Sequence, residues 1–184
     1  MDRVAEAKSR AARAGFAWSC DDAAGTTLSV LAAAVPPGGR ILEIGTGAGV
    51  GLAWLVCGVG TRDDVEIVTV EHDPDTSALA ADADWPPWVR LVTGDVLELL
   101  DGLGRFSLVF ADAPAGKWTG LDRTIAAVAP GGVLVVDDMR PAAWGSADHA
   151  AHTARVRATL VSHPDLVATE LPVGSGLIVC LRSA

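Results

Sequence analysis

Three glycines alternate with two small residues in the segment Gly45-Thr46-Gly47-Ala48-Gly49. Glycines at this spacing let a turn tighten and let a ligand approach the backbone. A dinucleotide-binding fingerprint continues with glycine or alanine, whereas this chain continues with Val50. The segment therefore predicts a ligand-binding turn, and a glycine-rich turn without a ligand is the alternative.

Two acidic residues further along the chain suit the same ligand. Glu71 lies about 20 residues beyond the glycines, the spacing of a carboxylate that accepts the hydroxyls of a ribose; a solvated strand end is the alternative. His72 follows it and would border the same group. Asp95 can accept a hydrogen bond from an adenine amino group, or it can cap a helix N-terminus, which aspartate favours.

Three further carboxylates, Asp112, Asp137 and Asp138, follow two predicted strands. If those strands are neighbours, the carboxylates converge, and their repulsion favours either protonation or a divalent cation such as Mg²⁺, Ca²⁺ or Mn²⁺. The metal-free alternative makes Asp112 or Asp138 a general base or a substrate contact. Lys117 can take a proton from a hydroxyl or stabilise its anion, or it can be a surface lysine.

Aromatic and imidazole side chains lie near these carboxylates in the sequence. Trp118 and Trp144 can line a pocket for an aromatic substrate, or they can anchor loops. His149 and His152 stand one helical turn apart, which suits either a metal pair or, more ordinarily, a solvated helix face.

Alternating helices and apolar strands must position these residues. Helices are expected at 1–14, 26–35, 50–59, 75–82, 96–100, 121–128 and 147–162, and strands at 40–44, 65–71, 89–93, 106–111, 132–136, 166–171 and 177–181. Continuous apolar strands separated by helices predict a parallel sheet covered on both faces, and the last two strands, with no helix between them, predict an antiparallel hairpin. The expected fold is an α/β, Rossmann-like, doubly wound seven-stranded sheet. Ligands of such sheets bind beyond the carboxyl ends of the strands.

Composition limits the class of protein. The 184 residues suit one domain, in which residues 1–35 form N-terminal helices bordering the site and 40–184 form the core. The net charge of −9, without a basic cluster, argues against a nucleic-acid partner. The absence of a long apolar stretch or signal-peptide core predicts a cytoplasmic protein without a membrane partner. Three widely spaced cysteines fit neither a disulfide framework nor a zinc site, and buried hydrophobic positions are expected for Cys57 and Cys180, which lie in apolar runs.

The motifs ILEIGTGAG, TVEHD, VTGDV, FADAPAGKW and APGGVLVVDDM occur in the order seen in class I S-adenosylmethionine methyltransferases. Between Gly25 and Met139 the chain most resembles small bacterial and catechol-type O-methyltransferases. The resemblance implies that S-adenosylmethionine is the cofactor and that a small-molecule hydroxyl is the acceptor. It places the following residues at the cofactor: Glu43 by the loop or the amino group, Gly45, Gly47 and Gly49 by the methionine part, Glu71 and His72 by the ribose, and Asp95 and Val96 by the adenine. Asp112 is expected to bind the cofactor as well.

The resemblance also suggests the reactive end of the site. The catechol-type family binds a metal through Asp, Asp and Asn, which correspond here to Asp112, Asp137 and Asp138, and it has a catalytic lysine where this chain has Lys117 after a longer loop. The family often forms homodimers, which are expected here too. Two other functions stay open on the sequence: an NAD(P)-type oxidoreductase, and a cofactor-binding regulator that has lost catalysis.

Overall fold

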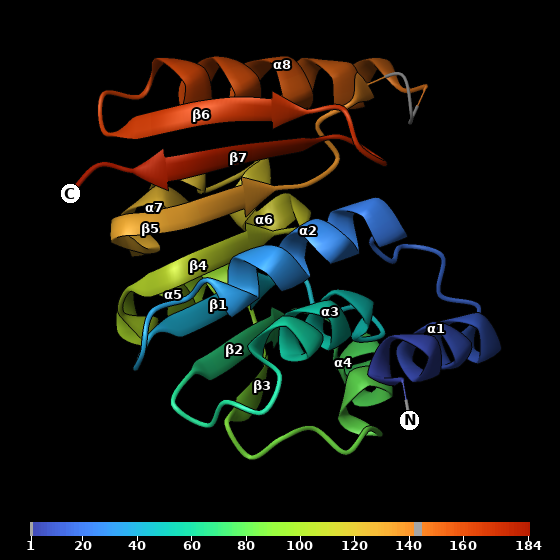
Figure 1. The fold of residues 1–184 in the computed structure, drawn as a ribbon. Coiled ribbons are helices and arrows are strands. Elements are labelled where there is room, and N and C mark those ends of the chain that lie inside the picture. Colours follow the sequence, from blue (N-terminus) through green and yellow to red (C-terminus); the bar gives the residue numbers. More distant parts are fainter. Residues whose placement is uncertain (1, 142–144) are drawn as a thin grey trace.

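A computed structural model describes residues 2–141 and 145–184 as one seven-stranded sheet with helices on both faces (Figure 1). The strand order is β3-β2-β1-β4-β5-β7-β6. The helices are α1 (Arg3–Ala14), α2 (Asp22–Ala33), α3 (Val50–Val59), α4 (Pro74–Ala81), α5 (Val96–Leu103), α6 (Pro114–Lys117), α7 (Leu121–Ala127) and α8 (Ala147–Ser162). The strands are β1 (Arg40–Ile44), β2 (Glu66–Glu71), β3 (Val89–Thr93), β4 (Phe106–Ala111), β5 (Val128–Val136), β6 (Leu166–Leu171) and β7 (Leu177–Arg182).

The pairing of the strands confirms the predicted topology. Strands β1 to β5 pair in parallel, and β7 lies antiparallel to both β5 and β6. The chain order reverses between β1 and β4, so this is the switch point of the doubly wound sheet. The carboxyl ends of β1, β2, β4 and β5 therefore lie along one edge, where the candidate residues follow them.

Each face of the sheet has its own hydrophobic core. Successive side chains of β1 point alternately into the two cores. Ile41 belongs to the core beneath α1, α2 and α3, and Leu42 belongs to the core beneath α5, α7 and α8. Figure 1 shows α1, α2 and α3 in front of the sheet and α5, α6 and α7 behind it. This covering explains why the parallel strands are apolar on both faces.

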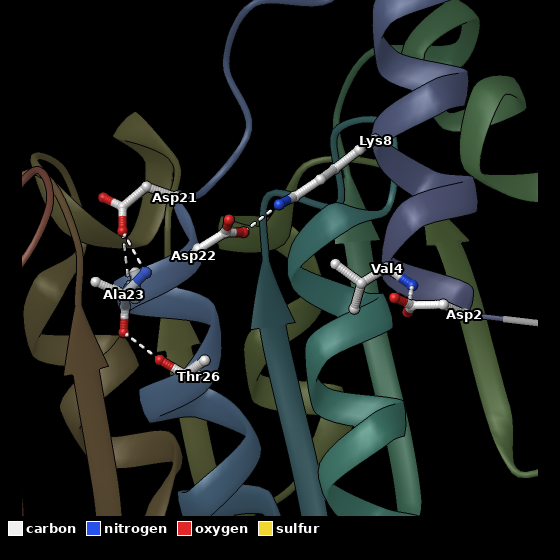
Figure 2. A network of polar contacts seen from close by, with 8 residues as sticks. Asp2, Val4, Lys8, Asp21, Asp22, Ala23 and Thr26 are labelled. Atoms are coloured by element: carbon white, nitrogen blue, oxygen red, sulfur yellow. Dashed lines mark hydrogen bonds and ion pairs between the residues drawn. The ribbon is translucent and has the colours of Figure 1, made fainter.

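Two aspartates fix the starts of the N-terminal helices (Figure 2). The Asp2 side chain accepts a hydrogen bond from the Val4 N–H at the start of α1, and the Asp21 side chain accepts two at the start of α2. Lys8 of α1 forms an ion pair with Asp22 of α2. The two helices are thus tied together beside the linker that joins them.

The sequence predicted that the second helix begins at residue 26, but in the structure it begins at Asp22. Gly25 therefore lies inside this helix. The position needs glycine, because a β-carbon there would lie 2.1 Å from the Trp54 indole nitrogen of α3. The close helix packing therefore outweighs the low helix propensity of glycine.

Other expectations also differ from the structure. Strand β5 begins at Val128, before the expected residue 132, and its pairing with β4 shifts register between Phe106 and Leu108. Helix α6 was not predicted, because four residues carry no periodicity. Cys57 is exposed, which contradicts the prediction of a buried position, whereas Cys180 is buried as expected. Among the described helices, none is both long and apolar enough to cross a membrane.

Candidate active site

The glycine turn follows β1 and packs closely against its neighbours. A β-carbon on Gly45 would lie 2.7 Å from the backbone oxygen of Asp112, and one on Gly47 would lie 2.9 Å from the Phe16 ring. Both glycines have positive φ, at 96° and 54°. The turn therefore needs glycine for conformation as well as for space. Gly49, the third predicted residue, precedes α3 as its N-cap.

Glu71 ends β2 and binds the glycine turn. Its Oε2 accepts a hydrogen bond from the Gly47 N–H at 2.9 Å, and its Oε1 accepts one from the Asp73 N–H at 3.1 Å. The carboxylate is half-buried and has further lone pairs that can accept hydroxyl groups. The exposed His72 follows it. The structure thus shows an anchoring role for Glu71, and its contact with a ribose stays a prediction.

Asp95 caps helix α5 by accepting a hydrogen bond from the Leu97 N–H at 2.8 Å. The N-cap role is therefore confirmed, while the adenine contact stays a prediction. Val96 is buried in the core beneath α5, so any contact it makes with a ligand comes from its backbone or from the edge of its side chain.

Glu43 lies buried beneath the glycine turn. Its Oε2 accepts a 2.5 Å hydrogen bond from the Thr69 hydroxyl, which lies 2.6 Å from the Thr46 hydroxyl in the turn. A β-carbon on Gly51 would lie 2.3 Å from Glu43 Oε1, so the carboxylate fits only against glycine. Burial raises the pKa of Glu43 to about 8, although the Thr69 hydrogen bond opposes this. Glu43 thus supports the turn from below.

The structure brings together the three predicted carboxylates. Asp112 follows β4 and Asp137 follows β5, and the Asp137 N–H donates to the Ala111 oxygen, which joins the two strand ends. Burial, then the nearby charge of Asp137, raises the pKa of Asp112 well above its ordinary value. Burial also raises the pKa of Asp137, although hydrogen bonding from Ser175 lowers it. Both shifts mark a crowded, electronegative site.

Lys117 lies among these carboxylates with its side chain only 1% exposed. Its Nζ lies 2.6 Å from Oδ2 of Asp138 and 3.9 Å from Oδ1 of Asp112. The alternative of a surface lysine is therefore wrong. Within residues 2–141 and 145–184, no group of three or more His, Cys, Asp or Glu side chains is arranged to hold a metal ion.

A cavity of about 580 Å³, here called the acceptor cavity, opens above the carboxylates. Its walls include Trp18 from the linker between α1 and α2, and Trp118 after α6; its polar lining includes Asp112, Lys117, Asp137 and Asp138. A narrow hollow, here called the turn cavity, lies between the glycine turn and the linker, and Glu43, Gly45, Cys20 and Asp112 contribute to it. Asp112 lines both cavities, so it stands where they meet.

Sequence reasoning missed several supporting contacts. The Ser175 hydroxyl donates to Asp137 Oδ1 at 2.5 Å, and the His149 Nε2 lies 2.8 Å from the Asp138 backbone oxygen. His149 and His152 both pack on the Trp118 ring, with centroids 5.3 and 5.5 Å away, so a fully solvated helix face is wrong for them. The only sequence signal near Ser175 is the Pro/Gly-rich loop before β7, which predicts a turn and no contact with Asp137. The prediction for Trp144 lies outside the described residues.

Known proteins resemble this chain over most of its length. A family model described as a methyltransferase domain matches residues 42–139. A protein of Mycobacterium sp. (strain JLS), named "Putative O-methyltransferase", is 34% identical, and the alignment covers 97% of this chain and 86% of the relative.

Solved structures agree. The O-methyltransferase TomG from Streptomyces achromogenes, involved in tomaymycin synthesis and crystallised with S-adenosylmethionine, is 25% identical with a TM-score of 0.82, covering 100% of this chain and 91% of its own. Cofactor-bound Rv0187 from MTB is 28% identical with a TM-score of 0.82, covering 98% and 89%. This chain therefore belongs to the family of S-adenosylmethionine-dependent O-methyltransferases.

Proposed function

We propose that this protein, acting as a single domain over residues 1–184, transfers a methyl group from S-adenosylmethionine to a hydroxyl group of a small molecule. The observation that carries this proposal is the acceptor cavity, whose lining combines two tryptophans with a largely buried cluster of carboxylates and one lysine. Such a cavity suits a ring-shaped acceptor that presents a hydroxyl to titratable groups.

The charge of the site supports a cationic cofactor. Lys117 is the only lysine or arginine among the described residues that line the acceptor and turn cavities, whereas Asp21, Glu43, Asp112, Asp137 and Asp138 are acidic. Burial raises the pKa of Glu43, Asp112 and Asp137, so these three carry less negative charge than ordinary carboxylates. A dinucleotide carries an anionic pyrophosphate, which this lining would repel. The methionine end of S-adenosylmethionine carries a sulfonium, an ammonium and a carboxylate group, and the lining attracts its net positive charge. This difference disfavours an NAD(P)-type oxidoreductase.

The chain offers contacts along the whole cofactor. Glu43, Gly45, Gly47 and Gly49 would surround the methionine end, Glu71 and His72 the ribose, and Asp95 and Val96 the adenine. Glu71 supports this arrangement, because its carboxylate keeps lone pairs that can accept hydroxyl groups. When bound, S-adenosylmethionine supplies a sulfonium methyl group, which the acceptor oxygen takes as the carbon–sulfur bond breaks.

The chain's own side chains would prepare the acceptor. Asp138 is 21% exposed at the cavity and can accept the proton of the acceptor hydroxyl, while Lys117 beside it can stabilise the oxygen that loses this proton. Asp112, at the meeting of the two cavities, would orient the hydroxyl toward the methyl group. We assign catalytic roles to these three residues.

A methylation assay tests this proposal. The protein is incubated with methyl-labelled S-adenosylmethionine and a panel of phenols, with matched anilines, thiols and benzoates as controls. Methyl ethers of the phenols are expected. Transfer to the anilines or benzoates alone would contradict the hydroxyl acceptor, and tight binding of S-adenosylhomocysteine without any transfer would indicate a regulator.

Three expectations about the protein's surroundings stay predictions. A homodimer is compatible with Val167 and Leu181, which are paired neighbours on β6 and β7 with exposed side chains. Sedimentation that shows only monomer at micromolar concentration would contradict it. Cytoplasmic location and the absence of a nucleic-acid partner rest on the sequence alone.

A further inference from the structure

The Lys117 ammonium occupies the centre of the carboxylate cluster. A fully buried lysine is rare in proteins unless its charge is paired, because burial removes its hydration. Here the pairing is close: Nζ lies 2.6 Å from Asp138 Oδ2 and 3.9 Å from Asp112 Oδ1, and it lies 4.6 Å from the centre of the Trp118 ring. The carboxylate of Asp138, the carboxyl group of Asp112 and the ring of Trp118 thus surround the ammonium group of the lysine.

The conformation of Asp138 is fixed around this cation. Asp138 has a φ of 64°, a left-handed value that is strained for a residue other than glycine. Three contacts hold it there: its N–H donates to Asp137 Oδ1 at 2.6 Å, its backbone oxygen meets the His149 ring, and its side chain pairs with Lys117. Several independent contacts therefore present this carboxylate to the lysine.

A divalent cation does not fit the same cluster beside this lysine. Mg²⁺ binds carboxylate oxygens at about 2.0–2.1 Å and needs about six oxygen ligands. Asp138 Oδ2 is already in contact with Nζ, and Asp137 Oδ1 accepts from both Ser175 and Asp138. A metal ion at these carboxylates would lie against the ammonium and be repelled by it.

We infer that Lys117 replaces the divalent cation in this site, so that this enzyme positions and deprotonates its acceptor hydroxyl without a metal ion. The inference rests on the proposed function, and it departs from the metal site that the sequence resemblance implied for Asp112, Asp137 and Asp138. The positive charge that stabilises the acceptor oxygen then belongs to the protein and cannot be removed by a chelator.

The lysine content of the chain allows a direct test. Lys8 and Lys117 are its only lysines, and Lys8 lies on α1 with its side chain 42% exposed. Protein labelled with ¹³C at the lysine side chains gives two sets of signals, which a Lys8→Arg variant assigns. Added Mn²⁺ is paramagnetic and broadens only the signals of nuclei close to the bound ion. We expect the Lys117 signals to keep their intensity in Mn²⁺, and turnover to be unchanged by excess chelator.

A variant without the lysine tests the converse, that a divalent cation binds once the ammonium group is removed. Lys117→Met removes the internal cation and leaves Asp112 and Asp138 unpaired, so calorimetry is expected to show Mn²⁺ binding that the parent protein and Lys8→Arg lack. If Lys117→Met does not fold, the signals of the parent protein still decide the question.

Binding of S-adenosylhomocysteine, measured on the same samples, separates this inference from the proposed function. If the product binds but Mn²⁺ selectively broadens the Lys117 signals, or chelation abolishes turnover, the replacement of the metal by Lys117 is wrong and the methyltransferase assignment stands. If the product fails to bind, the proposed function itself is wrong.

Discussion

The Oε2 atom of Glu71 accepts a hydrogen bond from the backbone N–H of Gly47 at 2.9 Å. The end of β2 thereby holds the turn that follows β1, and the same carboxylate would bind the ribose. Glu71→Ala removes both contacts. Since hydrogen bonds to charged groups contribute about 1.5–3 kcal/mol, we expect S-adenosylhomocysteine to bind about 10- to 100-fold more weakly, as measured by calorimetry.

Glu66→Gln is the matched control, because Glu66 begins the same strand and forms a partly exposed ion pair with Arg40. Partly exposed pairs contribute little, so this variant is expected to bind the product as the parent does. Equal affinity of Glu71→Ala and the parent would refute the ribose assignment.

Gly45 permits the close contact between the glycine turn and the residue after β4. Gly45→Ala places a β-carbon 2.7 Å from the Asp112 backbone oxygen, at a φ of 96°. Gly38→Ala also has positive φ, 70°, but meets nothing within 4 Å. The conformation alone costs about 1–2 kcal/mol, and crowding adds about 1–3 kcal/mol. Urea unfolding should therefore show a larger loss for Gly45→Ala, and equal losses would mean that the close approach is unimportant.

The sequence predicted the sheet well because its strands are apolar and its turns are marked by glycine, proline and aspartate. Strands β1, β3 and β4 have the predicted bounds, and β6 and β7 form the predicted antiparallel hairpin. The predicted start of α2 was wrong because glycine has a low helix propensity, so the local sequence places Gly25 before the helix. The close packing of Gly25 against Trp54 involves another helix, α3. Tertiary packing of this kind leaves no local pattern.

The sequence predicted one part of the candidate site, namely the residues that follow the strands. Residues at strand ends could be placed together, since parallel strands end at one edge. The burial of Lys117 could not be predicted, because Lys117 ends α6, a four-residue element whose sequence carries no periodicity. Ser175 and His149 reach the cluster from the loop before β7 and from α8, and neither segment has a motif that points to Asp137 or Asp138.

Glu43 should make the stability of the protein depend on pH. Its pKa rises from an ordinary 4.5 to about 8 on folding, so between these values the folded state holds a proton that the unfolded chain has released. The free energy of unfolding therefore falls as pH rises through this window and levels off above it. Glu43→Gln removes the effect, and its stability relative to the parent should grow by a few kcal/mol at most between about pH 5 and 8.

Urea unfolding at several pH values measures this difference. Glu98→Gln, at an exposed position of α5, is the control and should track the parent at every pH. A constant difference between Glu43→Gln and the parent across the window would show that the buried carboxyl does not titrate as described.

Trp118 should affect the acceptor and not the cofactor. It lines the acceptor cavity and packs on His149 and His152. Trp118→Ala removes ring contacts of about 0.5–1.5 kcal/mol, so KM for a phenolic acceptor should rise about 2- to 10-fold. Product affinity should not change. Trp88→Ala, a half-buried tryptophan before β3, controls for the loss of an indole; an equal rise in KM there would point to general destabilisation.

The linker between α1 and α2 gives the two ligands a common wall. Trp18, Ser19 and Cys20 line both the acceptor cavity and the turn cavity, and Asp21 beyond them receives the N–H of Ser175. Any displacement of this segment by one ligand changes the space left for the other. Affinities for cofactor and acceptor must then be linked, and by thermodynamic reciprocity each ligand changes the other's dissociation constant by the same factor. We expect calorimetric titrations of the acceptor with and without S-adenosylhomocysteine to give different dissociation constants, and equal constants would show that the linker does not couple the two sites.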